Sequence, residues 1–167
     1  MTNKYKYFVA NWKMFGNKKS INLINKVIKF SKLSKFRKAK IVYCPPYTIL
    51  GDFIKKLKNT NIKVGAQNCH FIDGDGPYTG FISAKMLKKI GCDYTIIGHS
   101  EQRYFGDTDE KINKKILLAT KNNLNVFFCV GEKLNEKRKN LTSKVLKNQL
   151  LKGLKKVKKL NKLIIAY

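Results

Sequence analysis

Residues 93–103 read DYTIIGHSEQR, a short apolar run that leads directly into a group of polar side chains. The apolar half, DYTIIG (93–98), is typical of a buried β-strand. Five further runs of this kind lie before and after it: YKYFVAN (5–11), KIVYC (40–44), IKVGAQ (62–67), NVFFCV (125–130) and KLIIAY (162–167). Strands that are almost continuously apolar predict a parallel sheet covered by helices.

Each of the first five strands is followed by a segment with the spacing of an amphipathic helix. The apolar positions are Ile21, Ile24, Val27, Ile28 and Leu33 in the first helix, and Ile49, Phe53, Ile54 and Leu57 in the second. The third helix is expected from about Ser83 to Ile90, with Gly91 as its stop. The fourth is expected over Asp109 to Lys121 with Asp107 or Thr108 as its cap, and the fifth over Leu141 to Leu160.

Repeated βα units of this length favour either a doubly wound open sheet or a (β/α)8 barrel. The loop after the first strand, NWKMFGNKKS (11–20), lacks the GxGxxG pattern of a dinucleotide-binding sheet. The pattern of elements does not decide between the two folds. Because no linker interrupts the pattern and the last strand has no helix after it, we expect one incomplete α/β domain over residues 1–167.

The chain carries a formal net charge of +26, which by itself would favour a nucleic-acid or membrane partner. However, arginine occurs only at Arg37, Arg103 and Arg138, and the lysines are spread along the whole chain. We therefore expect the lysines on solvated faces, and we keep a basic nucleic-acid-binding protein as an alternative. A hydrophobic content of 43% excludes a disordered chain.

The four cysteines, Cys44, Cys69, Cys92 and Cys129, form no CxxC pair and lie among apolar residues. This predicts reduced, mostly buried thiols in a cytoplasmic protein. The N-terminal sequence has too short an apolar run for a signal peptide, and no segment approaches the roughly 20 apolar residues of a membrane span. We expect no membrane partner.

Polar side chains follow three of the predicted strands. Asn11 and Lys13 follow the first, His99, Ser100 and Glu101 the fourth, and Glu132 the fifth. The active site of a (β/α)8 barrel lies at the carboxyl ends of its strands. In such a barrel these side chains would converge on one mouth.

Five motifs occur in a fixed order: NWKM (11–14), VGAQN (64–68), YTG (78–80), GHSEQR (98–103) and CVGE (129–132). In that order and strand context, the chain resembles the triosephosphate isomerase family over all its residues. The resemblance implies a TIM (β/α)8 barrel, of which about six strands and five helices are present. It also implies isomerisation of dihydroxyacetone phosphate and glyceraldehyde 3-phosphate through an enediolate, without a cofactor or metal.

The resemblance assigns roles to the polar residues at the strand ends. His99 would be the neutral electrophile that donates a hydrogen bond to the substrate carbonyl, and the positive end of the helix after it disfavours imidazolium. Lys13 would place positive charge near the phosphate and the developing oxyanion, with Asn11 as a neutral donor beside it. Ser100 would contact the substrate, and Glu101 would orient Lys13.

Glu132 would be a supporting carboxylate at the barrel mouth, with an ordinary structural ion pair as its alternative role. The segment QNCHFIDGDGPYTG (67–80), with Gln67, Tyr78 and Thr79, matches the long third loop that enters the partner subunit in the family. We therefore expect a homodimer of the whole protein.

Three features depart from the family pattern. Phe15 stands where the family usually has Asn, and Phe81 where it usually has an acid. Ala166 and Tyr167 match the residues before the family's catalytic glutamate, so that base is absent. A general base is commonly worth about 10²–10⁴-fold in rate, so we expect residues 1–167 to be inactive, and also poorly soluble because of open sheet edges. A truncated non-catalytic paralogue remains the further alternative.

Overall fold

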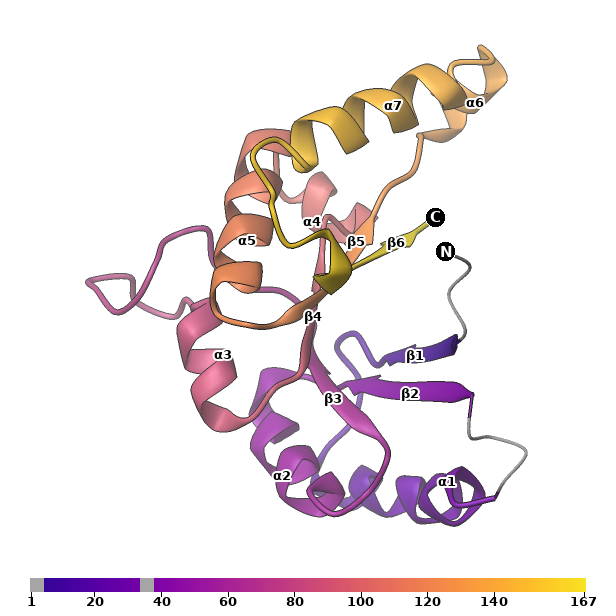
Figure 1. The fold of residues 1–167 in the computed structure, drawn as a ribbon, viewed down its shortest axis with the longest axis vertical. Helices are drawn as coiled ribbons and strands as arrows, with labels where there is room; N and C mark the ends of the chain where they lie inside the picture. The colour runs from indigo at the N-terminus through magenta and orange to yellow at the C-terminus, as the bar shows by residue number, and fades with distance from the viewer. Residues whose placement is uncertain (1–4, 34–37) are drawn as a thin grey trace.

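Six parallel strands form one curled sheet in a computed structural model, which describes residues 5–33 and 38–167 (Figure 1). The strands are β1 (Lys6–Asn11), β2 (Ala39–Cys44), β3 (Lys63–Ala66), β4 (Tyr94–Ile97), β5 (Asn125–Cys129) and β6 (Leu163–Ala166). Their order in the sheet is β1-β2-β3-β4-β5-β6, the same as in the chain. A doubly wound sheet reverses its order at a switch point, so the sheet is part of a barrel, as predicted from the family resemblance.

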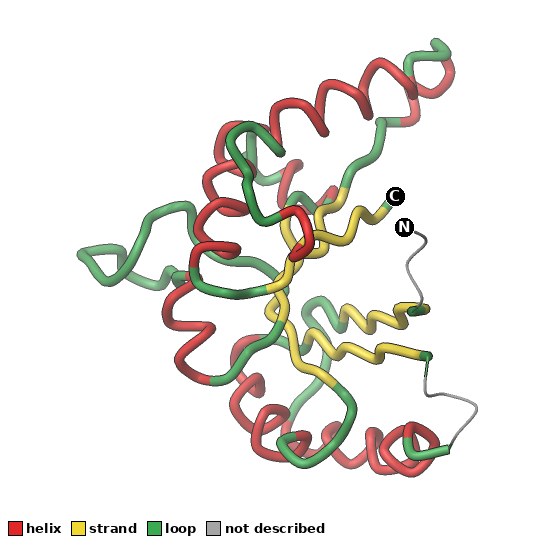
Figure 2. Tube along the Cα trace, viewed as in Figure 1, coloured by secondary structure: helices red, strands yellow, loops and turns green. Residues whose placement is uncertain are grey.

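Helices cover the convex face of the sheet, and its concave face opens toward the two chain ends (Figures 1 and 2). The α-helices are α1 (Ile24–Ser31), α2 (Tyr47–Leu57), α3 (Ala84–Ile90), α4 (Ser100–Tyr104), α5 (Asp109–Lys121), α6 (Leu134–Arg138) and α7 (Thr142–Gly153). Two 3₁₀ helices accompany them, η1 (Lys18–Leu23) and η3 (Leu160–Lys162). Helices on the outer face of a parallel sheet leave its inner face to form the barrel interior.

The third and fourth predicted helices are confirmed. The Ser83 hydroxyl accepts from the backbone N–H of Met86 at the start of α3, and Gly91 ends that helix at a φ of +104°. Of the two predicted caps of α5, Thr108 is the one whose side chain accepts from a helix N–H. These ends depend on local chemistry, which the sequence displays directly.

The first and fifth helices differ from their predicted bounds. Asn17 caps the chain early, so a 3₁₀ turn precedes α1, and Leu33 lies beyond the helix. The prediction of a helix to Leu160 was wrong, because α7 ends at Gly153 and Lys156 adopts a left-handed φ of +61°. Gly153 lies against the ring of Phe128, a tertiary contact that leaves no room for a Cβ and that no spacing rule contains. The short helix α6 was not predicted.

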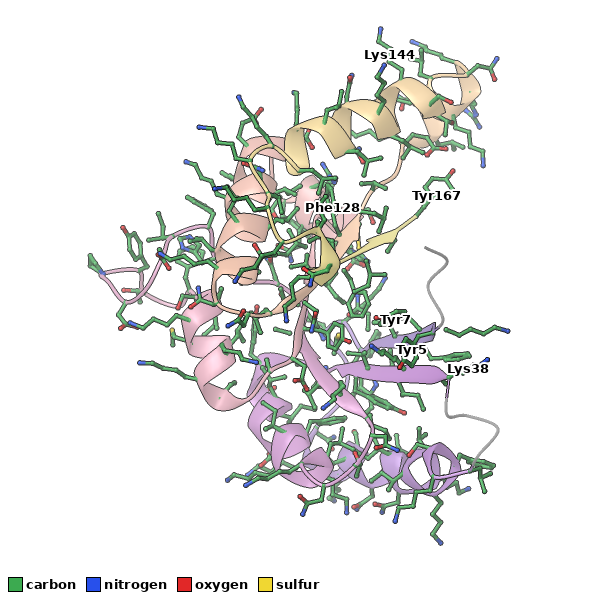
Figure 3. All side chains as sticks on the ribbon, in the orientation of Figure 1. Tyr5, Tyr7, Lys38, Phe128, Lys144 and Tyr167 are labelled. Atoms are coloured by element: carbon green, nitrogen blue, oxygen red, sulfur yellow. The ribbon has the colours of Figure 1, made fainter. Side chains whose placement is uncertain are left out.

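Two clusters of buried side chains lie on the two faces of the sheet. The larger one fills the space between sheet and helices, and includes Phe53 of α2. It also includes Phe128 of β5, which is labelled in Figure 3. The smaller one is built from strand residues alone. There, the rings of Tyr94 and Phe127 stack at 5.0 Å and Tyr7 meets both edge-on. Aromatic side chains thus fill the inner face below the site.

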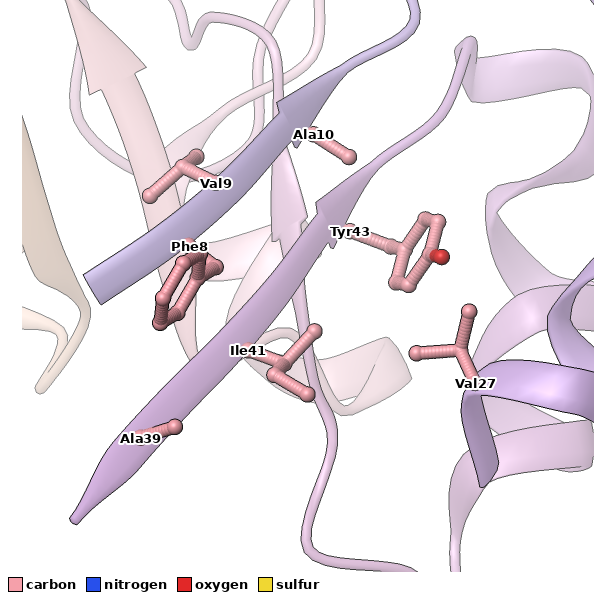
Figure 4. Close-up of a pocket in the computed structure, with 7 residues that line it drawn as sticks. All are labelled: Phe8, Val9, Ala10, Val27, Ala39, Ile41 and Tyr43. Atoms are coloured by element: carbon pink, nitrogen blue, oxygen red, sulfur yellow. The ribbon is translucent and has the colours of Figure 1, made fainter. Parts of the chain in front are cut away.

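The sheet has two open edges in the described chain, because β1 pairs with β2 and β6 pairs with β5 but not with each other. On the outer face of β1 and β2, an apolar hollow of about 390 Å³ separates Phe8, Ile41 and Tyr43 from Val27 of α1 (Figure 4). Phe8 is 56% exposed there. Exposed edges and apolar surface favour aggregation, so poor solubility of residues 1–167 stays a prediction.

The four cysteines are free thiols, and Cys44, Cys69 and Cys92 are buried, as predicted. Burial raises the pKa of each of these three thiols to about 12, which keeps them protonated and unreactive. Within residues 5–33 and 38–167, no helix is both long and apolar enough to cross a membrane.

Many lysines project from the helices, as Lys144 does from α7 (Figure 3). Lys115 of α5 contradicts the expectation that lysines occupy solvated faces, because its side chain is 4% exposed. It lies on the same helix face as Ile112 and Ile116, both fully buried. Arg37 lies outside the described residues.

Candidate active site

The carboxyl ends of β1 and β4 bring three predicted site residues into direct contact. The ammonium group of Lys13 lies 2.8 Å from Oε1 of Glu101, although 88 positions separate the two residues. His99 ends the loop after β4, and Glu101 is in the first turn of α4. A cation, an imidazole and a carboxylate therefore share one mouth of the sheet.

The imidazole of His99 is oriented by the start of α4. Its Nδ1 accepts a hydrogen bond from the backbone N–H of Glu101 at 3.2 Å. An Nδ1 that accepts a hydrogen bond carries no proton, so the proton of the neutral ring lies on Nε2. Oε2 of Glu101 also lies 3.5 Å from Nδ1, which would form an ion pair only if the ring were protonated. With Nδ1 engaged by the backbone, Nε2 is the donor that the neutral ring would offer to a ligand.

Glu101 forms an ion pair with Lys13. A hydrogen bond from the Lys13 ammonium lowers the pKa of the Glu101 carboxyl, and the positive charge of Lys13 acts in the same direction. The two side chains are 50% and 51% exposed, so solvent screens the pair. These contacts describe a pair between Lys13 and Glu101, and the orienting role that the resemblance implies for Glu101 stays a prediction.

The backbone of Lys13 is held by two further side chains. Its N–H donates to Oδ1 of Asn11 at 3.0 Å, and its carbonyl oxygen accepts from Nε2 of Gln67 at 2.9 Å. The resemblance grouped Gln67 with a dimer loop, but its side chain turns toward this chain's own Lys13. Oδ1 of Asn11 accepts a hydrogen bond from the backbone of Lys13, so Nδ2 is the atom of Asn11 that would donate to a ligand.

Glu132 belongs to a separate group of side chains. Its Oε1 accepts from the hydroxyl of Thr142 at 3.1 Å and from that of Tyr167 at 3.2 Å. Hydrogen bonding to its own backbone N–H, then to Thr142 and Tyr167, lowers the pKa of Glu132. In the described chain, Glu132 makes no hydrogen bond or ion pair with Lys13, His99 or Glu101. Within the described residues Glu132 thus has two hydroxyl donors, and its role as a supporting carboxylate stays a prediction.

The segment 67–80 with Tyr78 and Thr79 forms a loop that projects away from the body of the protein (Figure 1). Its acidic residues are tied to this chain's own helices, Asp75 to Lys85 at 3.0 Å and Asp73 to Lys121. Tyr78 is 43% exposed, and Thr79 is also exposed. Neither residue reaches the mouth formed by Lys13 and His99.

Two residues near the site were missed by the sequence reasoning. Arg103 donates from Nε to the carbonyl of Gly98 at 2.8 Å, from NH2 to that of Cys129 at 3.4 Å, and from NH1 to Asp109 at 2.7 Å. It thereby ties the ends of β4 and β5 to α5. Its place in GHSEQR, two positions after Glu101, was the signal available in the sequence.

Lys115 is the second missed residue. Its ammonium donates to both carboxylate oxygens of Asp107, at 2.7 and 2.6 Å, and to Oδ1 of Asn68 at 3.1 Å. Asn68 in turn donates to Oε1 of Gln102 in α4 at 2.9 Å. The spacing of Lys115 with Ile112 and Ile116 could have revealed that this lysine is on the buried face of α5.

Parallel strands in chain order, outer helices and a polar cluster at the carboxyl ends define a protein of the (β/α)-barrel class. Within the described chain, no group of three or more His, Cys, Asp or Glu side chains could hold a metal ion. The family model for triosephosphate isomerase matches residues 6–167. The chain belongs to the triosephosphate isomerase family.

Individual relatives agree with this assignment. A triosephosphate isomerase of Clostridium botulinum (strain ATCC 19397 / Type A) is 46% identical over 95% of this chain, and one of Dictyoglomus thermophilum is 46% identical over 97%. The crystal structure of triosephosphate isomerase from Bartonella henselae matches 96% of this chain with a TM-score of 0.88 and 37% identity. These matches favour the family over a basic nucleic-acid-binding protein.

The match covers only part of each relative. The chain spans 64% of the length of the Clostridium botulinum relative, 66% of the Dictyoglomus thermophilum relative and 66% of the Bartonella henselae chain.

Proposed function

We propose that this chain supplies the electrophile and the phosphate-binding lysine of a triosephosphate isomerase, which interconverts dihydroxyacetone phosphate and glyceraldehyde 3-phosphate. The observation that carries the proposal is the contact of Lys13 with Glu101 at 2.8 Å, beside a His99 ring whose Nδ1 accepts a backbone hydrogen bond. These groups suit a substrate with a carbonyl oxygen at one end and a phosphate at the other.

In the proposed reaction, the Nε2–H of His99 donates a hydrogen bond to the substrate carbonyl oxygen. As a general base takes a proton from the neighbouring carbon, the C–H electron pair moves into the enediolate and negative charge develops on that oxygen. A fixed donor and the nearby ammonium of Lys13 stabilise this charge more in the transition state than in the ground state. The Nδ2 of Asn11 and the hydroxyl of Ser100, which begins α4, would add neutral contacts to the substrate. No cofactor or metal takes part in the proposed mechanism.

We expect residues 1–167 alone to show no isomerase turnover. The two carboxylates at this end of the sheet are both engaged, Glu101 with Lys13 and Glu132 with Thr142 and Tyr167. These hydrogen bonds help to lower the pKa of both carboxyls, so each is a weaker base toward a proton on carbon, and losing a general base commonly costs about 10²–10⁴-fold. Binding of the phosphate group can therefore be tested separately from catalysis.

The test is a titration of the purified chain with inorganic phosphate and with dihydroxyacetone phosphate, followed by NMR at the backbone amides of Lys13 and His99. We expect saturable shifts in the parent that Lys13→Met removes. Lys63→Met is the matched control, because Lys63 is also half exposed and ion-paired, with Asp93 at 3.9 Å, but at the start of β3. Equal shifts in both variants would contradict the proposal, as would turnover by the parent that survives His99→Gln.

We further propose that the whole protein is a cytoplasmic homodimer whose partner receives the loop 67–80. Reduced buried cysteines support the compartment, and exposed aromatic side chains on and beside the loop support the interface. Phe81 is 58% exposed beside the loop, and Phe30 is 57% exposed on α1. In sedimentation experiments, Phe81→Ser should weaken self-association and Phe30→Ser should not. Equal association in both variants would exclude the loop as the interface.

A further inference from the structure

The ion pair between Lys13 and Glu101 cannot by itself fix the position of the Lys13 ammonium. Both side chains are about half exposed, at 50% and 51%, and exposed ion pairs contribute little because solvent screens them. A long lysine side chain also loses rotamer entropy when it is held in one place. The position of the ammonium must therefore depend on where the backbone of Lys13 lies.

That backbone adopts an uncommon conformation. Lys13 has a φ of +51°, in the left-handed region that residues with a Cβ rarely occupy. Such a conformation persists only where surrounding groups hold it in place. The groups that hold Lys13 are therefore part of what positions its ammonium.

Two side chains from neighbouring strand ends hold the peptide groups of Lys13. Oδ1 of Asn11 accepts from the Lys13 N–H at 3.0 Å. On the other side, Nε2 of Gln67 donates to the Lys13 carbonyl at 2.9 Å and to the Cys44 carbonyl at 2.9 Å. Gln67 follows directly after β3, and Cys44 ends β2. One carboxamide thus joins the end of β2 to the loop that carries Lys13.

The orientation of this carboxamide follows from its neighbours. Both groups that it meets are carbonyl oxygens, which can only accept, so the nitrogen with its two hydrogens must face them. Each hydrogen has one carbonyl partner. A side chain without an N–H at this position would leave the Lys13 carbonyl without its donor.

We propose that Gln67 is a positioning residue, which holds Lys13 in its left-handed conformation and thereby places the ammonium against Glu101. Its importance for the isomerase reaction rests on the proposed function, but its effect on Lys13 does not. The carboxyl of Glu101 reports on that effect, because its hydrogen bond from Lys13 is the largest cause of its lowered pKa.

The test is an NMR titration of the Glu101 side-chain carboxyl in four forms of the chain: the parent, Gln67→Met, Lys13→Met and Gln149→Met. Methionine matches the length of glutamine but donates no hydrogen bond. Gln149 is the matched control, because its Nε2 also donates to a backbone carbonyl, that of Gly131 at 2.8 Å, at the other side of the sheet. We expect the Glu101 pKa to rise toward that of an ordinary glutamate in Gln67→Met and Lys13→Met. In Gln149→Met it should stay as in the parent.

An unchanged Glu101 pKa in a folded Gln67→Met chain would overturn the proposal. If that variant does not fold, Gln67→Asn keeps the carboxamide on a shorter side chain and should raise the Glu101 pKa part of the way. An unchanged pKa in the asparagine variant would also overturn the proposal. Unfolding of both variants would make Gln67 a structural residue and overturn it as well.

Inorganic phosphate separates this inference from the proposed function. We expect Gln67→Met to weaken phosphate binding about tenfold, which corresponds to about 1.4 kcal/mol. If the parent does not bind phosphate but the Glu101 pKa still rises in Gln67→Met, the proposed function fails and the positioning role stands. If the parent binds phosphate and Gln67→Met changes neither binding nor the Glu101 pKa, the positioning role fails alone.

Discussion

Lys115→Met removes the positive charge from a side chain that is 4% exposed and leaves Asp107, which is 10% exposed, without its partner. Asp107 then loses two hydrogen bonds of 2.7 and 2.6 Å. Asn68 loses less, because its Oδ1 still accepts from the backbone N–H of Cys69 at 2.9 Å. Breaking a buried ion pair from one side costs about 3–5 kcal/mol. The remaining exposure of Asp107 places this variant near the lower end, at about 3 kcal/mol.

The measurement is urea unfolding, followed by the fluorescence of Trp12 and by circular dichroism. Lys114→Met is the matched control, because Lys114 is the exposed neighbour of Lys115 on the same helix. We expect the control to change the free energy of unfolding by less than about 0.5 kcal/mol. Asp107→Ala in the Lys115→Met background should recover much of the loss, since no unpaired charge then remains. The reasoning is refuted if Lys115→Met and Lys114→Met are equally stable.

Four further results are expected. Gly51→Ala should raise the free energy of unfolding by about 0.5–1 kcal/mol, because Gly51 lies inside α2 and a Cβ there meets no atom within 4 Å. Gly153→Ala should lower it by about 1–3 kcal/mol, because a Cβ there would overlap the buried ring of Phe128, and equal effects at the two glycines would contradict the packing argument. The hydrogen bond between Tyr167 and Glu132 lowers the pKa of the glutamate and raises that of the tyrosine. It should therefore be lost both as pH falls through the Glu132 pKa and as pH rises through the Tyr167 pKa, which NMR of the tyrosine ring would follow; a ring signal that titrates unchanged in Glu132→Gln would argue against the bond. Duplex DNA should bind at low salt and be released by about 200 mM salt, and binding that persists would revive the nucleic-acid alternative.

The sequence predicted those parts of the fold that depend on local chemistry. Ser83 and Gly91 mark the two ends of α3 by capping, and Thr108 marks the start of α5. The packing of Gly153 at the end of α7 could not be predicted, because its neighbour is the ring of Phe128, 25 positions earlier in the chain. Barrel and open sheet were not distinguished by periodicity, because both repeat the same βα unit and differ only in strand order.

The sequence indicated which residue types lie at the candidate site. It did not indicate which side chains hold their backbones in place. Lys13, His99 and Glu101 could be placed near one another because carboxyl ends of parallel strands meet at one edge. Nothing in the sequence indicated the left-handed backbone of Lys13, because lysine has no preference for that region. The contact of Gln67 with Lys13 also had no signal, because a residue's place in the loop 67–80 gives no information on where its carboxamide points.

The backbone at the candidate site is held by hydrogen bonds from side chains more than by ion pairs. Ion pairs at the mouth of the sheet are exposed to solvent, so they are too weak to hold a reacting group in one place. Hydrogen bonds from side chains to backbone carbonyls take over that task, from Gln67 to Lys13 and from Arg103 to Gly98 just before His99. Gln67 joins the end of β2 to the loop that carries Lys13, and Arg103 joins the ends of β4 and β5. Both donors are planar groups, so each fixes a direction as well as a distance. Because Lys13 and His99 are positioned by separate donors, a change at Gln67 should displace the lysine and leave the imidazole in place.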